Sequence, residues 1–342
     1  VGYQASYSGT TGSYNTSLGH SALKANTTGQ ENIAVGWLAL TANTTSNQNV
    51  AVGNASLTSN TTGASNVAVG QQALQGNTTA SNNTAVGYVA GYSTTTGALN
   101  TFVGREAAYS NTTGQHNVAI GQSANYANTT GNYNVSLGSQ ALRFNTTASS
   151  NTAVGYQSLY ANTTGYSNTA VGYQSLDSNT TGAGNSTFGR GAGAGNTTGT
   201  NINIFGINAG LSSTTANNIT AFGSDTLRNN TASNNAGFGS GALYTNTTGT
   251  GNTALGPAAY GATQGPLGLN TSGSSNTAIG MQALLSNTTA SNNTALGYQA
   301  GYAVTTGIRN TFLGTSTATS ASSGNDNVFI GYNAGTYSVA TT

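Results

Sequence analysis

Side chains capable of acid–base or metal chemistry are scarce in this chain and share no common spacing. Of the 342 residues only 3% are charged, with five acids and two histidines. These residues are Glu31, Glu106, Asp177, Asp225, Asp326, His20 and His116. They form no carboxylate pair, catalytic triad or metal cluster, and no Gly-rich phosphate loop accompanies them. Cysteine is absent, which removes disulfides and thiolate metal sites. We therefore expect no enzyme activity, no cofactor and no metal.

The charge balance also limits the classes of partner that the chain can bind. The formal net charge is +1, whereas capture of nucleic acid needs clustered Lys and Arg. No apolar run approaches the roughly 20 residues of a membrane helix. We expect no nucleic-acid partner and no membrane insertion in this segment.

Two recurring polar patterns could serve recognition. The Asn-Thr-Thr sequence is an N-glycosylation sequon, and the candidate sites are Asn26, Asn60, Asn128 and Asn162. The alternative is that these residues only shape turns, because Asn readily caps turns. Tyrosine rings can stack on sugars, and the candidate glycan contacts are Tyr88, Tyr156, Tyr173 and Tyr298. A second tyrosine series includes Tyr92, Tyr109, Tyr126 and Tyr160. The alternative for both series is that the rings cover neighbouring coils or a subunit seam.

One 17-residue unit positions all of these residues. The glycine that follows each Asn-Thr-Ala-Val-like block recurs at Gly2, Gly19, Gly36, Gly53, Gly70, Gly87, Gly104, Gly121, Gly138, Gly155, Gly172, Gly189, Gly206 and Gly223. One 16-residue step leads to Gly239, and after Gly256 one 24-residue step leads to Gly280. A short period held along a whole chain is typical of a solenoid. We expect an all-β fold: one continuous parallel β-solenoid over 1–342, with about twenty repeats.

With this glycine as position 1, the unit reads Gly-Tyr-Gln-Ala-Leu-x-x-Asn-Thr-Thr-Gly-x-x-Asn-Thr-Ala-Val. Two extended runs are expected per coil, one at Asn-Thr-Ala-Val and one at Thr-Thr-Gly. Asparagine recurs at positions 8 and 14, and stacked amides can bond along such columns. We interpret both columns as structural. The columns at positions 14, 17 and 1 include Asn83, Asn100, Asn151, Val86, Val154, Val171, Gly87 and Gly155.

Positions 5 and 16 exchange volume. Gly91 precedes Phe102, and Gly301 precedes Phe312, whereas Leu at position 5 is followed by a small or modest residue at position 16. Close-packed interiors penalise both voids and overpacking, so these positions are expected to face each other inside the coil. Gly210 breaks the pattern, and we expect the nearby Phe222 to compensate.

If position 16 points inward, position 17 points outward by strand alternation. Position 17 is nevertheless always Val, Ile, Leu or Phe. An outward apolar stripe marks an interface, so we expect self-association along the chain. The alternative is a monomer with position 17 inside.

Two further expectations concern the surface. The paired threonines resemble ice-binding ladders, but adjacent residues alternate faces, so only one Thr per coil can point outward. The 24-residue step carries seven extra residues (24 minus 17). We place these seven within the stretch Gly261–Gly268, in a surface loop near 257–275 that is either a partner contact or a neutral insertion.

Blocks such as Asn83–Gly87, Asn151–Gly155 and Asn293–Gly297 resemble the head repeats of trimeric autotransporter adhesins and repeat regions of phage tail fibres. The resemblance spans the chain and implies a trimeric, left-handed β-roll at a cell surface or on a virion. We expect a segment of a longer extracellular fibre shaft, without a targeting peptide, anchor or chaperone domain in this segment. The alternative is a solenoid that binds glycan or ice directly.

Overall fold

The computed structural model describes residues 1–320 and 323–335. The chain forms two compact units, Val1–Asn168 and Thr169–Thr342. Each unit is a stack of parallel β-coils, and the described residues contain no helix. Paired strands in each unit are offset by one repeat, as in Thr16 with Ile33 and Thr169 with Ser186. The predicted all-β parallel solenoid is therefore confirmed.

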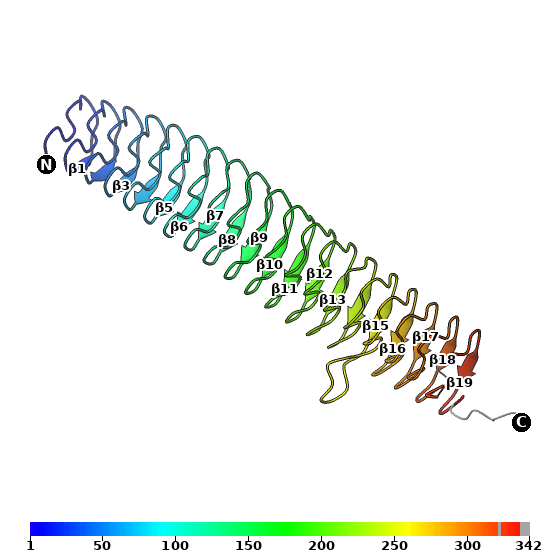
Figure 1. Cartoon of the computed structure of the whole chain (residues 1–342). Helices are drawn as coiled ribbons and strands as arrows, with labels where there is room; N and C mark the ends of the chain where they lie inside the picture. The colour runs from blue at the N-terminus through cyan, green and yellow to red at the C-terminus, as the bar shows by residue number, and fades with distance from the viewer. Residues whose placement is uncertain (321–322, 336–342) are drawn as a thin grey trace, which may run out of the picture. The chain divides into compact units, whose positions relative to one another are not determined.

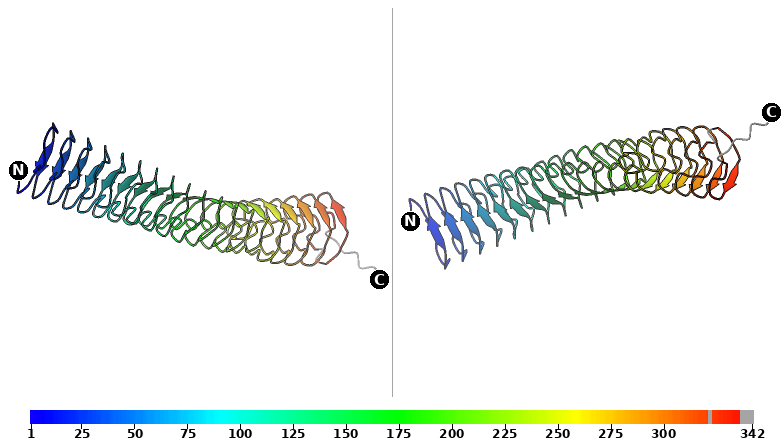
Figure 2. Two further views of the ribbon diagram at one scale, coloured as in Figure 1. Left: turned by 90° about the horizontal axis from the view of Figure 1, so that it is seen from above. Right: turned by 90° about the horizontal axis from the view of Figure 1, so that it is seen from below.

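Each coil contributes one three-residue strand, formed by positions 15 to 17 (Figure 1). The first unit contains β1 (Thr16–Leu18), β2 (Ile33–Val35), β3 (Val50–Val52), β4 (Val67–Val69), β5 (Thr84–Val86), β6 (Thr101–Val103), β7 (Val118–Ile120), β8 (Val135–Leu137) and β9 (Thr152–Val154). The second contains β10 (Thr169–Val171), β11 (Ser186–Phe188), β12 (Asn203–Phe205), β13 (Thr220–Phe222), β14 (Ala236–Phe238), β15 (Thr253–Leu255), β16 (Thr277–Ile279), β17 (Thr294–Leu296), β18 (Thr311–Leu313) and β19 (Val328–Ile330). In Figure 2 the strands of the first unit lie in one row along one side of its coils.

The Thr-Thr-Gly segment is not a strand, which corrects the expectation of two extended runs per coil. Asn26 Nδ2 donates to the carbonyl of Gly29 at 3.0 Å and closes a tight turn over the two threonines. The N–H groups of Thr27 and Thr28 both donate to the single carbonyl of Thr44, at 2.8 and 3.3 Å. A ladder strand would instead use separate carbonyls, so the segment is a bend.

The two asparagine columns form buried ladders that meet at one carbonyl. At position 14, the backbone N–H of Asn66 donates to Asn49 Oδ1 at 3.0 Å. At position 8, Asn60 Nδ2 donates to Asn43 Oδ1 at 3.2 Å. The Gly63 carbonyl at position 11 accepts from both Asn49 and Asn60, at 2.9 Å each. Both columns therefore fix the same turn, which confirms their structural interpretation.

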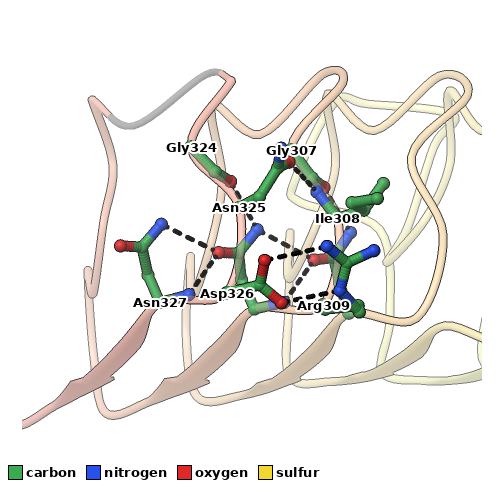
Figure 3. Close-up of polar contacts among 9 residues, drawn as sticks. Gly307, Ile308, Arg309, Gly324, Asn325, Asp326 and Asn327 are labelled. Carbon is green, nitrogen blue, oxygen red and sulfur yellow. Dashed lines mark hydrogen bonds and ion pairs between the residues drawn. The ribbon is translucent and has the colours of Figure 1, made fainter.

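The position-14 ladder continues near the end of the described chain, where the N–H of Asn327 donates to Asn310 Oδ1 at 2.9 Å. Position 12 adds a separate bond between the same coils. Figure 3 shows the side chain of Asn325 turned toward Ile308, whose N–H it accepts at 2.9 Å. Next to it, Arg309 and Asp326 form a two-bonded ion pair across adjacent coils, at 2.6 and 2.8 Å. The polar side of the coil is thus bonded through side chains as well as through its backbone.

The apolar core lies between positions 5 and 16, as the volume exchange predicted. A Cβ atom on Gly91 would lie 2.7 Å from Phe102 Cδ2 and 2.9 Å from Leu74 Cδ2. Phe102 and Leu74 are fully buried. The large ring at position 16 therefore occupies the volume that Leu takes at position 5 in other coils.

The exchange also reaches the following coil, which corrects the explanation of Gly210. A Cβ atom on Gly210 would lie 2.5 Å from Ile204 Cδ1. Ile204 belongs to the preceding coil, and its Cδ1 would also lie 3.3 Å from a Cβ atom on Gly193. Ile204 thus fills the space above Gly210, and Phe222 is not needed, since it points outward and is 39% exposed.

Position 1 accepts only glycine because of its backbone. These glycines have φ from 113° to 147°, a region that is essentially closed to other residues. A Cβ atom on Gly87 would also overlap the Gly104 carbonyl of the next coil. Position 11 is equally crowded, since a Cβ on Gly97 would overlap the Gly114 carbonyl, yet Ala80 occupies this position in the preceding coil. Crowding alone is tolerated, so φ decides the invariance of position 1.

The insertion lies at Ala259–Gly265, between positions 3 and 4. The N–H of Ala258 donates to Ser240 and the carbonyl of Pro266 accepts from Leu243, which are the ordinary coil bonds of those positions. Figure 1 shows the insertion projecting next to β15. The placement at Gly261–Gly268 was wrong at its end, because Pro266 and Leu267 are buried in the coil.

The 16-residue step before Gly239 lacks position 10, an exposed residue of the Thr-Thr bend in other coils.

Replacing Gly87 by Ala should destabilise the first unit by roughly 2–4 kcal/mol, from backbone strain and overpacking together. Gly97→Ala is the matched control, because its crowding is similar and its φ is ordinary. It should cost about 1 kcal/mol or less. Urea unfolding of both variants measures the difference, and equal losses would contradict the role given to φ.

Gly91→Leu should cost about 1–3 kcal/mol by overpacking, and Phe102→Ala about 3–5 kcal/mol by leaving a cavity. The double variant restores the Leu and Ala pair of other coils, so its loss should be smaller than the sum of the single losses. Leu74 already has φ of 48° at position 5, so the backbone accepts the new leucine. A double-mutant cycle gives the coupling, and additive losses would show that the two sites do not touch.

Removing Ala259–Gly265, with Ala258→Gln and Pro266→Ala, should leave the midpoint of thermal unfolding nearly unchanged. The two substitutions restore the usual Gln-Ala-Leu and avoid a left-handed residue before proline. Deleting seven residues from Pro266 to Ser272 is the control, and it should unfold the neighbouring coils because Leu267 and Asn270 are fully buried. Equal damage from both deletions would place the loop in the core.

Candidate functional surface

The outer side of the strands carries positions 15 and 17, and we call it the apolar face because position 17 is always Val, Ile, Leu or Phe, whereas position 15 is most often Thr. Position 16 is fully buried, as in Ala34, Ala51 and Ala85, so alternation turns its neighbours outward. Val86 is 38% exposed and Leu137 44%. The alternative placement, with position 17 inside the coil and position 16 outside, is therefore wrong. Val154 and Val171 also lie on this face and are half-buried.

The composition of the apolar face differs between the units. In the first, position 15 is often aliphatic, as in Ile33, Val50 and Val67. In the second, position 17 carries a run of four stacked rings, with centroids 4.5 to 5.6 Å apart. These rings are Phe188, Phe205, Phe222 and Phe238. Sequence analysis recognised the apolar column but missed the stack, although the recurrence of Phe at the repeat spacing signals it.

The four candidate glycan-contact tyrosines all lie at position 2 and are exposed. Their exposed fractions run from 41% to 50%, for Tyr88, Tyr156, Tyr173 and Tyr298. Position 2 follows the glycine directly, so these rings border the apolar face. The structure thus leaves open both the sugar contact and the seam between subunits.

The second tyrosine series packs along the coil surface. The rings of Tyr92, Tyr109 and Tyr126 stack 5.0 and 5.2 Å apart and are nearly parallel. The guanidinium of Arg143 lies 5.7 Å from the ring centre of Tyr126 and 5.4 Å from that of Phe144. Desolvation first, and then the neighbouring tyrosines, raise the pKa of Tyr109. These rings cover neighbouring coils, which agrees with the alternative interpretation of this series.

The few charges are mostly paired locally. Arg105 contacts Glu106 at 3.0 Å, Arg228 contacts Asp225 at 3.1 Å, and Arg309 contacts Asp326. The hydrogen bond from Arg309 holds the pKa of the Asp326 carboxyl below its usual range. Burial raises the pKa of Asp177. These acids belong to separate sites, and the described residues contain no group of three or more His, Asp or Glu that could hold a metal.

The four candidate glycosylation sites are buried in the folded coil. Asn26 is 3% exposed, and Asn60, Asn128 and Asn162 are fully buried. The Nδ2 atom, to which a glycan would be linked, donates instead to the position-11 carbonyl and to the preceding Asn, as in Asn128 at 3.0 and 2.9 Å. The folded coil has no room for a glycan here, so the turn-shaping alternative holds.

The threonine columns divide as alternation predicted. Thr27 Oγ1 donates to the Thr44 carbonyl at 3.0 Å, whereas Thr28 is exposed. One threonine per coil therefore faces water. This single column does not provide the paired array that an ice-binding face needs.

No described segment forms a helix that is long and apolar enough to cross a membrane. No protein-family model, curated protein or solved structure matches the chain.

Proposed function

We propose that the chain is a structural shaft segment of an extracellular fibre, of the kind found in surface adhesins and phage-like tail fibres. The observation that supports it most is the apolar face, which combines a regular scaffold with an outward hydrophobic surface. The resemblance of the Asn-Thr-Ala-Val-Gly blocks to adhesin heads and tail fibres supports the same function. In this proposal the coils space a binding tip from its anchor, outside a cell or on a virion.

The partner of the apolar face is a second and third copy of the chain. With coils about 4.8 Å apart and strands about 10 Å long, the face of one unit covers roughly 400 Å². Position 17 forms an unbroken apolar column along this strip, and contiguous exposed apolar surface often marks an interface. A surface with so few charges offers little else to keep such strips apart. A homotrimer buries the strips around a common axis and leaves the polar bends in water.

Direct binding of a cell-surface glycan is the second candidate, because the position-2 tyrosines are exposed. It is compatible with the shaft, since those rings lie beside the apolar face and not in its centre. Substitutions can separate the two functions, because assembly depends on positions 15 and 17 whereas glycan binding depends on the tyrosines at position 2.

The variant V52E/V69E/V86E should convert an oligomer to a monomer, because three carboxylates would be buried in the interface. The control T62E/T79E/T96E adds the same charge at position 10, which is exposed on the polar bends, and should stay oligomeric. Sedimentation equilibrium at micromolar concentration measures mass, and circular dichroism checks the fold. A folded, monomeric unsubstituted chain, or equal dissociation of both variants, would overturn the proposed assembly.

A further inference from the structure

The second unit contains a surface hollow that is distinct from the apolar face. Its volume is about 180 Å³, and its lining includes Tyr173, Arg190, Gly191, Asn208 and Leu211. Drug-sized ligands occupy sites of about 300–1,000 Å³. The hollow is therefore of a size for a single small ring.

A missing side chain creates this hollow. Gly191 stands at position 3, where neighbouring coils carry Gln174 and Asn208. A Cβ atom on Gly191 would lie 2.9 Å from Asn208 Oδ1 and 3.7 Å from Leu211 Cδ1. Any side chain at this position would thus begin to fill the space between the amide and the leucine.

Arg190 is the exceptional arginine of the chain. Arg105, Arg228 and Arg309 are in ion pairs, and Arg143 lies over aromatic rings. In the described part of the chain, Arg190 is in no ion pair and over no ring, yet it lines the hollow. Asp225, in the coil that follows Asn208, is already engaged by Arg228.

The chemistry of the lining indicates the ligand. An arginine fork binds a planar carboxylate through two parallel bonds. An exposed tyrosine ring offers an apolar face with a polar tip, which suits the C–H face and hydroxyls of a sugar. The amides of Gln174 and Asn208 both donate and accept. We propose that this hollow binds a sugar ring that carries a carboxylate, as uronic and sialic acids do.

The matched ligands for the test are methyl glucuronoside and methyl glucoside, which differ only at C6, where the first has a carboxylate and the second a hydroxymethyl group. Titration calorimetry with the full chain should show roughly 10- to 100-fold tighter binding of the glucuronoside, the range expected for a charge-assisted hydrogen bond. N-acetylneuraminic acid and glucose 6-sulfate are the further arms. If N-acetylneuraminic acid binds more tightly than the glucuronoside, the result supports the site and assigns the sugar class to sialic acids. If glucose 6-sulfate binds as tightly as the glucuronoside or more tightly, the result contradicts a carboxylate site.

Arg190→Gln should remove the preference for the glucuronoside. Arg105→Gln is the matched control, because Arg105 also occupies position 2 but is paired with Glu106, and it should leave binding unchanged. Gly191→Gln should abolish binding of both sugars without loss of fold, since Gln72, Gln140 and Gln282 occupy position 3 with φ near 60°.

Binding that persists in Gly191→Gln, or a preference that survives Arg190→Gln, would overturn the site. Equal loss in Arg105→Gln would do the same, by showing a general charge effect. The oligomeric state of each variant is measured in parallel, so failure of this site is distinguishable from failure of the proposed assembly.

Discussion

The close approach of successive coils at position 1 is the constraint on which the structure depends. Each of these glycines adopts a φ that other residues avoid, and each lies against the carbonyl of the next glycine in its unit. Because the chain reverses there without a side chain, the strand that precedes it can pair in register with the next. A side chain at one coil would push two coils apart and break the bonds on both sides. The period of the sequence is therefore the period of this contact.

The asparagine ladders solve the problem that such close stacking creates. The coils bury asparagine side chains together with apolar ones, and buried polar groups must be hydrogen-bonded. Each ladder amide bonds both along the column and to the position-11 turn, as Asn49 and Asn60 do at the Gly63 carbonyl. Where Ile202 replaces the amide, its N–H still donates to Asn185, but no side-chain amide continues the column. In the same coil the position-8 ladder still bonds back to the preceding coil, from Asn196 to Asn179, but Ser213 follows at position 8 and ends that run of amides as well.

Sequence alone predicts which side chains face into the coil, but it does not predict the backbone conformation of the turns. Strand alternation and the exchange between Gly91 and Phe102 were enough to place position 16 inside and position 17 outside. The left-handed leucines of position 5, such as Leu23 with φ of 53°, were not predictable, because Leu carries no preference for that conformation. Pro266 was misread as part of the loop. It fits the coil because the position-4 N–H ordinarily makes only a long local bond, as from Ala22 to Gly19 at 3.4 Å.

The regular coil is also compatible with a proposed shaft that carries a specific binding site. Within each unit the coils bond through the backbone and through buried amides. Side chains at positions 2 and 3 can therefore vary, as can position 6 outside the tyrosine stack. A change at these positions alters the surface without altering the stack. Arg190 beside Gly191 is such a change, since neither residue is required by the ladders or the core. In another coil, Arg105 and Glu106 occupy the same two positions and form an ion pair. Local pairing of adjacent side chains thus decides which coils are inert and which present an unpaired charge beside a hollow.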